Sequence, residues 1–166
     1  MTDKHALPTP PAALQGLDDL AALAAPLSRL GELTRDASLR LGLDAQAAAQ
    51  AAADGGLVLG DAPVSVTAIP LSALAEGSKD VTVISVAMAR RIDEMSAADL
   101  AALLAHSPGL LAVSDATLGC QPDGSLVLHR VLRGDGLDGE ALAAALLHAR
   151  QLVQLISDEA GPAEVQ

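Results

Sequence analysis

Three glycines in the C-terminal third of the chain have the spacing of a nucleotide-binding loop. Gly134, Gly136 and Gly139 form a G-x-G-x-x-G pattern between a predicted strand and a predicted helix, which is the position of a dinucleotide-binding fingerprint. Such a site also needs a further parallel strand that carries a ribose-binding acid, and only ten residues follow Ile156. Asp135 would in addition repel a pyrophosphate. A plain loop and a helix cap are therefore the favoured interpretation.

The other residues with potential chemistry are scattered along the chain. Four histidines lie in a predicted tail, helix end, strand and helix, with no pair at metal-ligand spacing, namely His5, His106, His129 and His148. Cys120 alternates with Leu118, which we expect to be buried, so a small inert core residue is favoured over a nucleophile. Adjacent acids such as Asp93 and Glu94 point apart, and solvated charge is their default role. The sequence predicts no catalytic residue, no metal and no cofactor, and hence no enzyme.

Composition narrows the classes of partner. The 166 residues include 10 Lys and Arg against 21 Asp and Glu, a net charge of -11 that disfavours nucleic acid and anionic membranes. Without Phe, Tyr or Trp the chain has no aromatic platform for stacking bases. No window approaches the roughly 18 uninterrupted apolar residues that predict membrane insertion. A single cysteine and an N-terminus without a signal-peptide pattern indicate the cytoplasm. We therefore expect an acidic cytoplasmic protein with a basic or amphipathic partner.

Hydrophobic periodicity in the first half predicts a helix followed by strands. Leucines recur at helical spacing over residues 14–33, with Pro26 interrupting the pattern. Three β-branched segments follow, over residues 57–59, 64–69 and 81–88. Short polar connections between these segments predict an antiparallel meander.

The second half is predicted to contain a short helix, a hairpin and a long closing helix. Ser96 and Asp99 have the spacing of a capping box, and Pro108-Gly109 is expected to end the helix that they begin. Pro122-Asp123-Gly124 is a turn between two alternating segments. Asp138 is a good N-cap for the closing helix, whose apolar residues recur at spacings of four and three.

The expected architecture is α+β. We predict an antiparallel twisted sheet of about five strands with three helices, in the order helix, three strands, helix, two strands, helix. Residues 14–158 form a single domain in this interpretation. Residues 1–13 and 159–166 are expected to be flexible tails, because proline, glycine and small polar residues dominate them.

Short motifs accompany this order of elements in the C-terminal third of the chain. They are Ala116-Thr117-Leu118-Gly119, Pro122-Asp123-Gly124-Ser125-Leu126-Val127-Leu128 with Arg130 at the end of the strand, and Gly136-Leu137-Asp138 before the last helix. In their order and spacing these motifs resemble the class I type III secretion chaperones. The alanine-rich and leucine-rich composition without aromatic residues is most similar to the broad-specificity export-control chaperones of plant-pathogenic bacteria.

The resemblance implies a virulence-associated homodimer that binds the N-terminal region of secreted effector proteins. It would keep that region non-globular and deliver it to the export apparatus, with the export ATPase or another component of the secretion machine as a further partner. The expected partner-binding residues are Leu27, Leu30, Leu33, Val66 and Val83, and the expected dimer-interface residues are Leu100, Leu103 and Leu104. The leucines of the middle helix fit a core and an interface equally well, whereas Ile84, Val86 and Met88 favour core. A non-catalytic regulatory adapter of the same fold, which binds a secretion-machine component, is the alternative.

Overall fold

The computed structural model of the chain describes residues 29–69, 81–133 and 136–159. All structural statements concern these ranges. The predicted tail over residues 1–13 lies outside them, as does the tail over residues 159–166 apart from its first residue. Leu27, His5 and Gly134 also lie outside the described residues.

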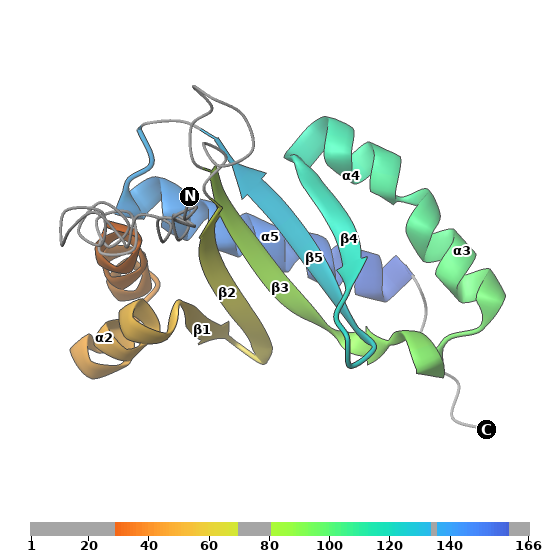
Figure 1. Cartoon of the computed structure of the whole chain (residues 1–166), viewed down its shortest axis with the longest axis horizontal. Helices are drawn as coiled ribbons and strands as arrows, with labels where there is room; N and C mark the ends of the chain where they lie inside the picture. The colour runs from red at the N-terminus through yellow and green to blue at the C-terminus, as the bar shows by residue number, and fades with distance from the viewer. Residues whose placement is uncertain (1–28, 70–80, 134–135, 160–166) are drawn as a thin grey trace, which may run out of the picture.

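Five antiparallel strands form one sheet in the order β1-β2-β3-β5-β4 (Figure 1). The strands are β1 (Gly56–Leu59), β2 (Ala62–Ile69), β3 (Val81–Arg91), β4 (Ala116–Cys120) and β5 (Ser125–Leu132). The predicted meander is present as β1, β2 and β3, and the predicted hairpin as β4 and β5. The second hairpin strand pairs with β3, so β4 and β1 are the outer strands of the described sheet. The α+β prediction is confirmed.

Several helices accompany the sheet. They are a helix over residues 29–40, α2 (Ala45–Asp54), α3 (Ala97–Ala105), α4 (Ser107–Ser114) and α5 (Gly139–Glu159), with a short 3-10 turn, η2 (Ile92–Glu94). The alanine-rich segment forms α2 because alanine has the highest helix propensity and Asp44 caps its N-terminus, accepting a hydrogen bond from the Ala47 N–H at 2.8 Å. The helices α2 and α4 are additional to the three that were predicted.

The middle helix is followed directly by a second short helix. The Ser96 capping box is present, with the Asp99 N–H donating to Ser96 Oγ at 3.1 Å. The helix begun at Ser96 ends at Ala105, before Pro108-Gly109 as predicted, but a second helix, α4, follows at once and was not predicted. Pro108 lies in the first turn of α4, where its missing N–H has no intrahelical partner to lose. A single residue, His106, joins α3 to α4.

One face of the sheet is covered by α5, which crosses behind β3 and β5 (Figure 1). Ile84, Val86 and Met88 of β3 are buried in the core, as predicted. The apolar stripe of α5 packs against the same core, with Leu142, Leu146, Ala149, Val153 and Ile156 all buried. The predicted N-cap is also present, because Asp138 Oδ1 accepts a hydrogen bond from the Ala141 N–H at 2.8 Å.

The helix over residues 29–40 packs against the start of α5. The Asp36 side chain fills the place that a Cβ at residue 139 would occupy, so Gly139 permits this close approach. Arg40 contacts Asp36 at 3.2 Å and Glu140 at 3.6 Å, which links the two helices by charge. This packing fixes the described N-terminal helix at the β1 end of the molecule (Figure 1).

Candidate functional site

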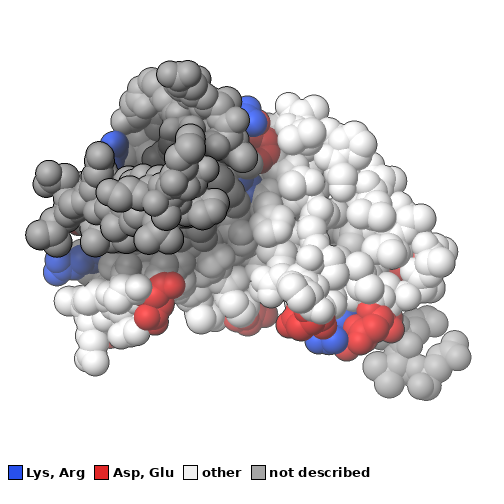
Figure 2. All heavy atoms as spheres, in the orientation of Figure 1, with Lys and Arg blue, Asp and Glu red and all other residues white. Residues whose placement is uncertain are grey.

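Among the described residues, the most exposed apolar surface lies on α3 and α4. We use the name "helical apolar surface" for Leu104, Leu111 and Val113, whose exposed fractions are 50%, 59% and 86%. Asp99 is the one charged residue between Ala97 and Ser114, and the molecular surface over α3 and α4 is largely free of charged side chains (Figure 2). Exposed apolar patches rimmed by polar residues mark interaction sites in soluble proteins. This surface is therefore the first candidate for a partner interface.

The position of α3 and α4 explains why their apolar residues stay exposed. The two helices lie beyond the outer strand β4, and α4 contacts that strand, whereas α5 lies across the sheet itself (Figure 1). Only one inward row of side chains can then reach the core. Leu103 belongs to that row and is 2% exposed, whereas Leu100 is half-buried.

The three predicted dimer residues consequently have different environments. Leu104 projects into solvent and is available to a partner. Leu103 belongs to the core, so its assignment to an intersubunit contact is corrected here. The sequence pattern could not separate them because adjacent leucines of a short amphipathic helix differ only in which side meets the sheet.

The same helical run also meets the length and composition of a membrane-spanning helix. It extends from Ala97 to Ser114, and 11% of it is buried. A single such run is a weak indication, and the break at His106 divides it into two short helices. Asp115 then adopts a left-handed conformation (φ 49°) and leads directly into β4. The helices are thus joined at one end to the sheet, which favours a protein partner over a lipid one.

The predicted partner-binding residues do not form one groove. Val66 is 2% exposed and pairs with Ile84 on the face that α5 covers. Val83 pairs with Thr67 and is half-buried on the opposite face. Because successive strand residues alternate between faces, a single groove cannot contain both valines, and that prediction is corrected.

The predicted partner-binding leucines that the structure describes in the first helix, Leu30 and Leu33, face the core. Leu30 is buried in the hydrophobic cluster, and Leu33 packs partly buried against it. The more accessible apolar side chain of this helix is Leu39, which is exposed. A client segment that contacts this helix would meet Leu39 rather than Leu30.

The outer edge of β1 presents unpaired backbone and one apolar side chain. Val58 is 59% exposed, and β1 pairs with β2 alone in the described sheet. The Val66 N–H donates to the Gly55 carbonyl at 2.8 Å, and hydrogen bonding alternates along an antiparallel pair. The N–H and C=O of Val58 therefore point away from β2. Such an edge can accept an additional strand.

A serine and a histidine form a hydrogen-bonded pair on the sheet face opposite α5. Ser85 Oγ and His129 Nδ1 are 2.8 Å apart on adjacent strands. Gly119 leaves room for the ring, since a Cβ there would lie 2.8 Å from His129 Nε2. A nucleophilic serine needs a base that a third group orients, and the described residues place no carboxylate in hydrogen-bond contact with His129. The pair links β3 to β5.

Cys120 is exposed, so the prediction of a buried core residue is wrong. It is the last residue of β4, an outer strand, and its Sγ lies 3.2 Å from the Gln121 carbonyl oxygen. Alternation with Leu118 predicts the correct face of the sheet, but the side chain at the end of this outer strand stays exposed. Within the described ranges, no three His, Cys, Asp or Glu side chains are placed to hold a metal.

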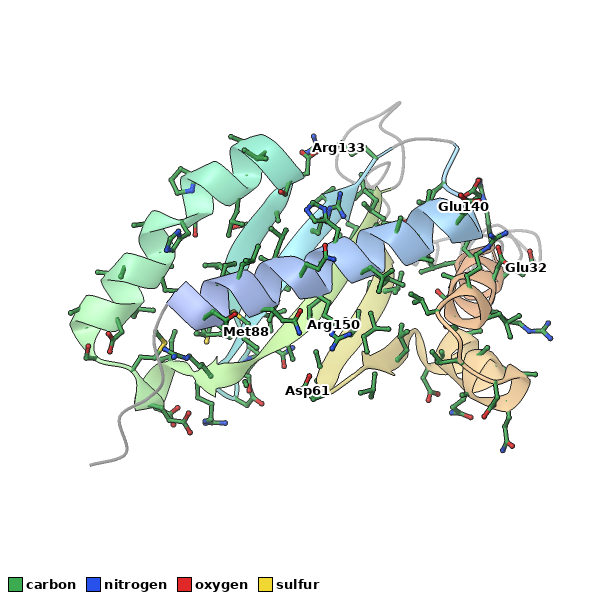
Figure 3. The ribbon with its side chains drawn as sticks, turned by 180° about the vertical axis from the view of Figure 1, so that it is seen from behind. Glu32, Asp61, Met88, Arg133, Glu140 and Arg150 are labelled. Carbon is green, nitrogen blue, oxygen red and sulfur yellow. The ribbon has the colours of Figure 1, made fainter. Side chains whose placement is uncertain are left out.

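A cavity of about 530 Å³ lies where β5 ends beside α5. We use the name "basic pocket" for the residues that line it: Asp115, Arg130, Val131, Leu132, Arg133, Leu137, Ala141, Ala144, Ala145 and His148. Arg133 lies at the end of the sheet far from Met88 (Figure 3). The only sequence signal for this site is the basic residues at the end of β5. That this strand end lies beside α5 could not be predicted from the sequence.

Arg130 is the structural centre of the basic pocket. Its Nε donates to the Ser114 carbonyl at 3.2 Å and its Nη1 to the Ala145 carbonyl at 3.1 Å. Burial lowers the pKa of Arg130, and the nearby Asp115 carboxylate opposes that shift. Asp115 also lies 3.5 Å from Arg133 Nη1, and both of these side chains are exposed.

Comparison of the chain with models of known protein families finds no match, and neither does comparison with curated protein sequences. The family resemblance therefore rests on the order of the elements and on the short motifs of the sequence.

Proposed function

We propose that the chain is a type III secretion chaperone, a cytoplasmic homodimer that binds the N-terminal region of secreted effector proteins and delivers it to the export apparatus. The observation that carries the proposal is the helical apolar surface. A folded domain that leaves Leu104, Leu111 and Val113 in solvent needs a partner to cover them. In this account the partner is a second copy of the chain.

The lack of charge on the helical apolar surface favours a symmetric contact between two copies. A twofold interface brings the same residues of two copies together, so a charged patch would oppose itself, whereas leucine, valine and alanine side chains pack without penalty. The sheet edge at β4 lies beside the surface. The two subunits would then meet through the middle helices and leave β1 accessible at the far end of each sheet (Figure 1).

The free edge of β1 supports binding of an extended segment. Strand addition gives affinity through backbone hydrogen bonds, and exposed side chains such as Val58 and Leu39 give apolar contacts. This mode holds a client non-globular because the client backbone pairs with β1 instead of with itself. The net charge of -11 favours rapid association with basic segments.

Coexpression tests this proposal. Tagged N-terminal segments of candidate secreted proteins are expressed with the chain and purified, and the retained chain is quantified. We expect a soluble complex. In it, the client amides that pair with β1 should exchange with deuterium more slowly than in the free client. The Val58→Pro variant, which removes the outward N–H, should weaken client binding about tenfold. Val58→Thr keeps that N–H and serves as the matched control.

The same experiment separates the chaperone from the adapter. A chain that retains a component of the secretion machine, and retains none of the secreted segments, would be a regulatory adapter. Retention of neither would contradict both functions.

A further inference from the structure

The basic pocket combines fixed positive charge with apolar walls. Arg130 and Arg133 contribute two guanidinium groups, and Asp115 contributes one carboxylate among the described residues of the lining. Six lining residues are alanine, valine or leucine, namely Val131, Leu132, Leu137, Ala141, Ala144 and Ala145. The chain has a net charge of -11, yet the described charged residues of this cavity are positive in sum.

Arg130 is held in place before any ligand arrives. Its two hydrogen bonds go to the end of α4 and to the first half of α5, so it loses little side-chain freedom on binding. A guanidinium has five N–H donors, and these two bonds occupy two of them. The remaining donors are available for a planar anion such as a carboxylate.

Arg133 is the second group that can reach a ligand. Its contact with Asp115 is 3.5 Å long and exposed to solvent, and such pairs contribute little free energy. An incoming carboxylate can therefore contact Arg133 without breaking a strong interaction. His148, on α5, completes the polar part of the lining.

We propose that the basic pocket binds an acidic side chain of the client segment, together with an apolar neighbour that packs on the alanine and leucine wall. The assignment to a client rests on the proposed function, whereas the preference for a carboxylate with an apolar neighbour rests on the lining of the cavity. The cavity is open to solvent, and its volume of about 530 Å³ is large enough to admit a side chain and its neighbour. The pocket would select where along an extended client the chaperone binds.

Titration of the isotope-labelled full chain by NMR tests this inference. The probes are acetyl-Leu-Glu-Leu-amide, its Gln counterpart and inorganic phosphate. We expect the Glu peptide to shift the amides of Arg133, Leu137 and His148, and the Gln peptide to bind about tenfold more weakly because it lacks the charge-assisted bonds. The Arg133→Gln substitution should weaken binding of the Glu peptide about threefold to fivefold.

The control variant is Arg91→Gln. Arg91 is a comparable cation that contacts Asp93 at 3.1 Å and pairs with Ser125 at the start of β5, so it lies at the opposite end of that strand from Arg133. This variant should leave binding of the Glu peptide unchanged. Equal binding of the Glu and Gln peptides, or an equal loss in both variants, would overturn the inference.

The phosphate titration separates the two sources of anion. If phosphate changes the amide chemical shifts of the pocket residues and the Glu peptide does not, the peptide assignment is overturned and the pocket is a site for small anions. Client capture without any pocket shift would overturn this inference and leave the proposed function standing. Pocket shifts with the Glu peptide in a chain that captures no client would support the carboxylate site and contradict the proposed function.

Discussion

Arg130 in β5 donates a hydrogen bond from Nη1 to the backbone carbonyl of Ala145 in α5, 3.1 Å away. The same guanidinium donates from Nε to the Ser114 carbonyl at the end of α4. One side chain therefore ties the sheet to the closing helix and to the middle helix. This relationship fixes the relative position of the basic pocket and the helical apolar surface.

Replacing Arg130 should destabilise the fold. Arg130→Met leaves two partly buried carbonyls without their charged donor, and we expect a loss of about 2 to 3 kcal/mol in the free energy of unfolding. Arg133→Met removes only an exposed contact and should cost less than about 1 kcal/mol. Urea unfolding followed by far-ultraviolet circular dichroism measures both variants, and equal losses would contradict the role assigned to Arg130.

Two adjacent leucines should respond in opposite ways. Leu103→Ala removes a core side chain and should lower the free energy of unfolding by about 3 kcal/mol. Below its melting temperature this variant should still form the proposed dimer. Leu104→Asp places a charge on the helical apolar surface and should yield a folded monomer. Light scattering and circular dichroism on the two variants separate these effects. A dimer that tolerates Leu104→Asp would exclude this surface as the interface.

Much of the fold could be predicted because its signals are local. The Ser96 capping box, the Pro122-Asp123-Gly124 turn and the Asp138 N-cap each depend on residues within a few positions of one another, and each is present. Three strands follow from β-branched segments, and the two hairpin strands follow from alternating segments joined by a turn. Their antiparallel meander and hairpin follow from the short connections.

The mistaken predictions concern what lies next to an element rather than the element itself. Pro108 was predicted to stop the middle helix, which does end before it, but the same proline also lies in the first turn of the unpredicted helix α4. Cys120 has the alternation of a core residue, but its strand is an outer one. The Arg130 contact with Ala145 joins segments 15 residues apart through tertiary packing, which no local pattern encodes.

A side chain at residue 119 should disturb the sheet face opposite α5. Gly119→Val would force the His129 ring away and break its hydrogen bond with Ser85, with an expected loss of about 1 to 3 kcal/mol from overpacking. Gly136→Ala is the control, because no atom of the described residues lies within 4 Å of a Cβ at that position. A thermal melt that ranks the two variants equally would contradict this packing.

The hairpin turn should lose stability in acid. The pKa of Asp123 is lowered chiefly by hydrogen bonds from the backbone N–H and the hydroxyl of Ser125, the former at 2.9 Å. A lowered folded-state pKa gives stabilisation that is complete above the unfolded value of about 3.9 and is lost as the pH falls through the folded value. The deficit of Asp123→Ala relative to the native chain should therefore be full at neutral pH and shrink in strong acid. A deficit independent of pH would disprove this.

The mass of the purified chain in solution, measured by multi-angle light scattering with refractive-index detection, tests the central claim most directly. Refractive index is needed because the chain contains no Trp or Tyr. We predict about twice the chain mass of 16.6 kDa, and a further increase by the mass of a coexpressed secreted segment. A monomer that retains no such segment would contradict both the interface on α3 and α4 and the chaperone function.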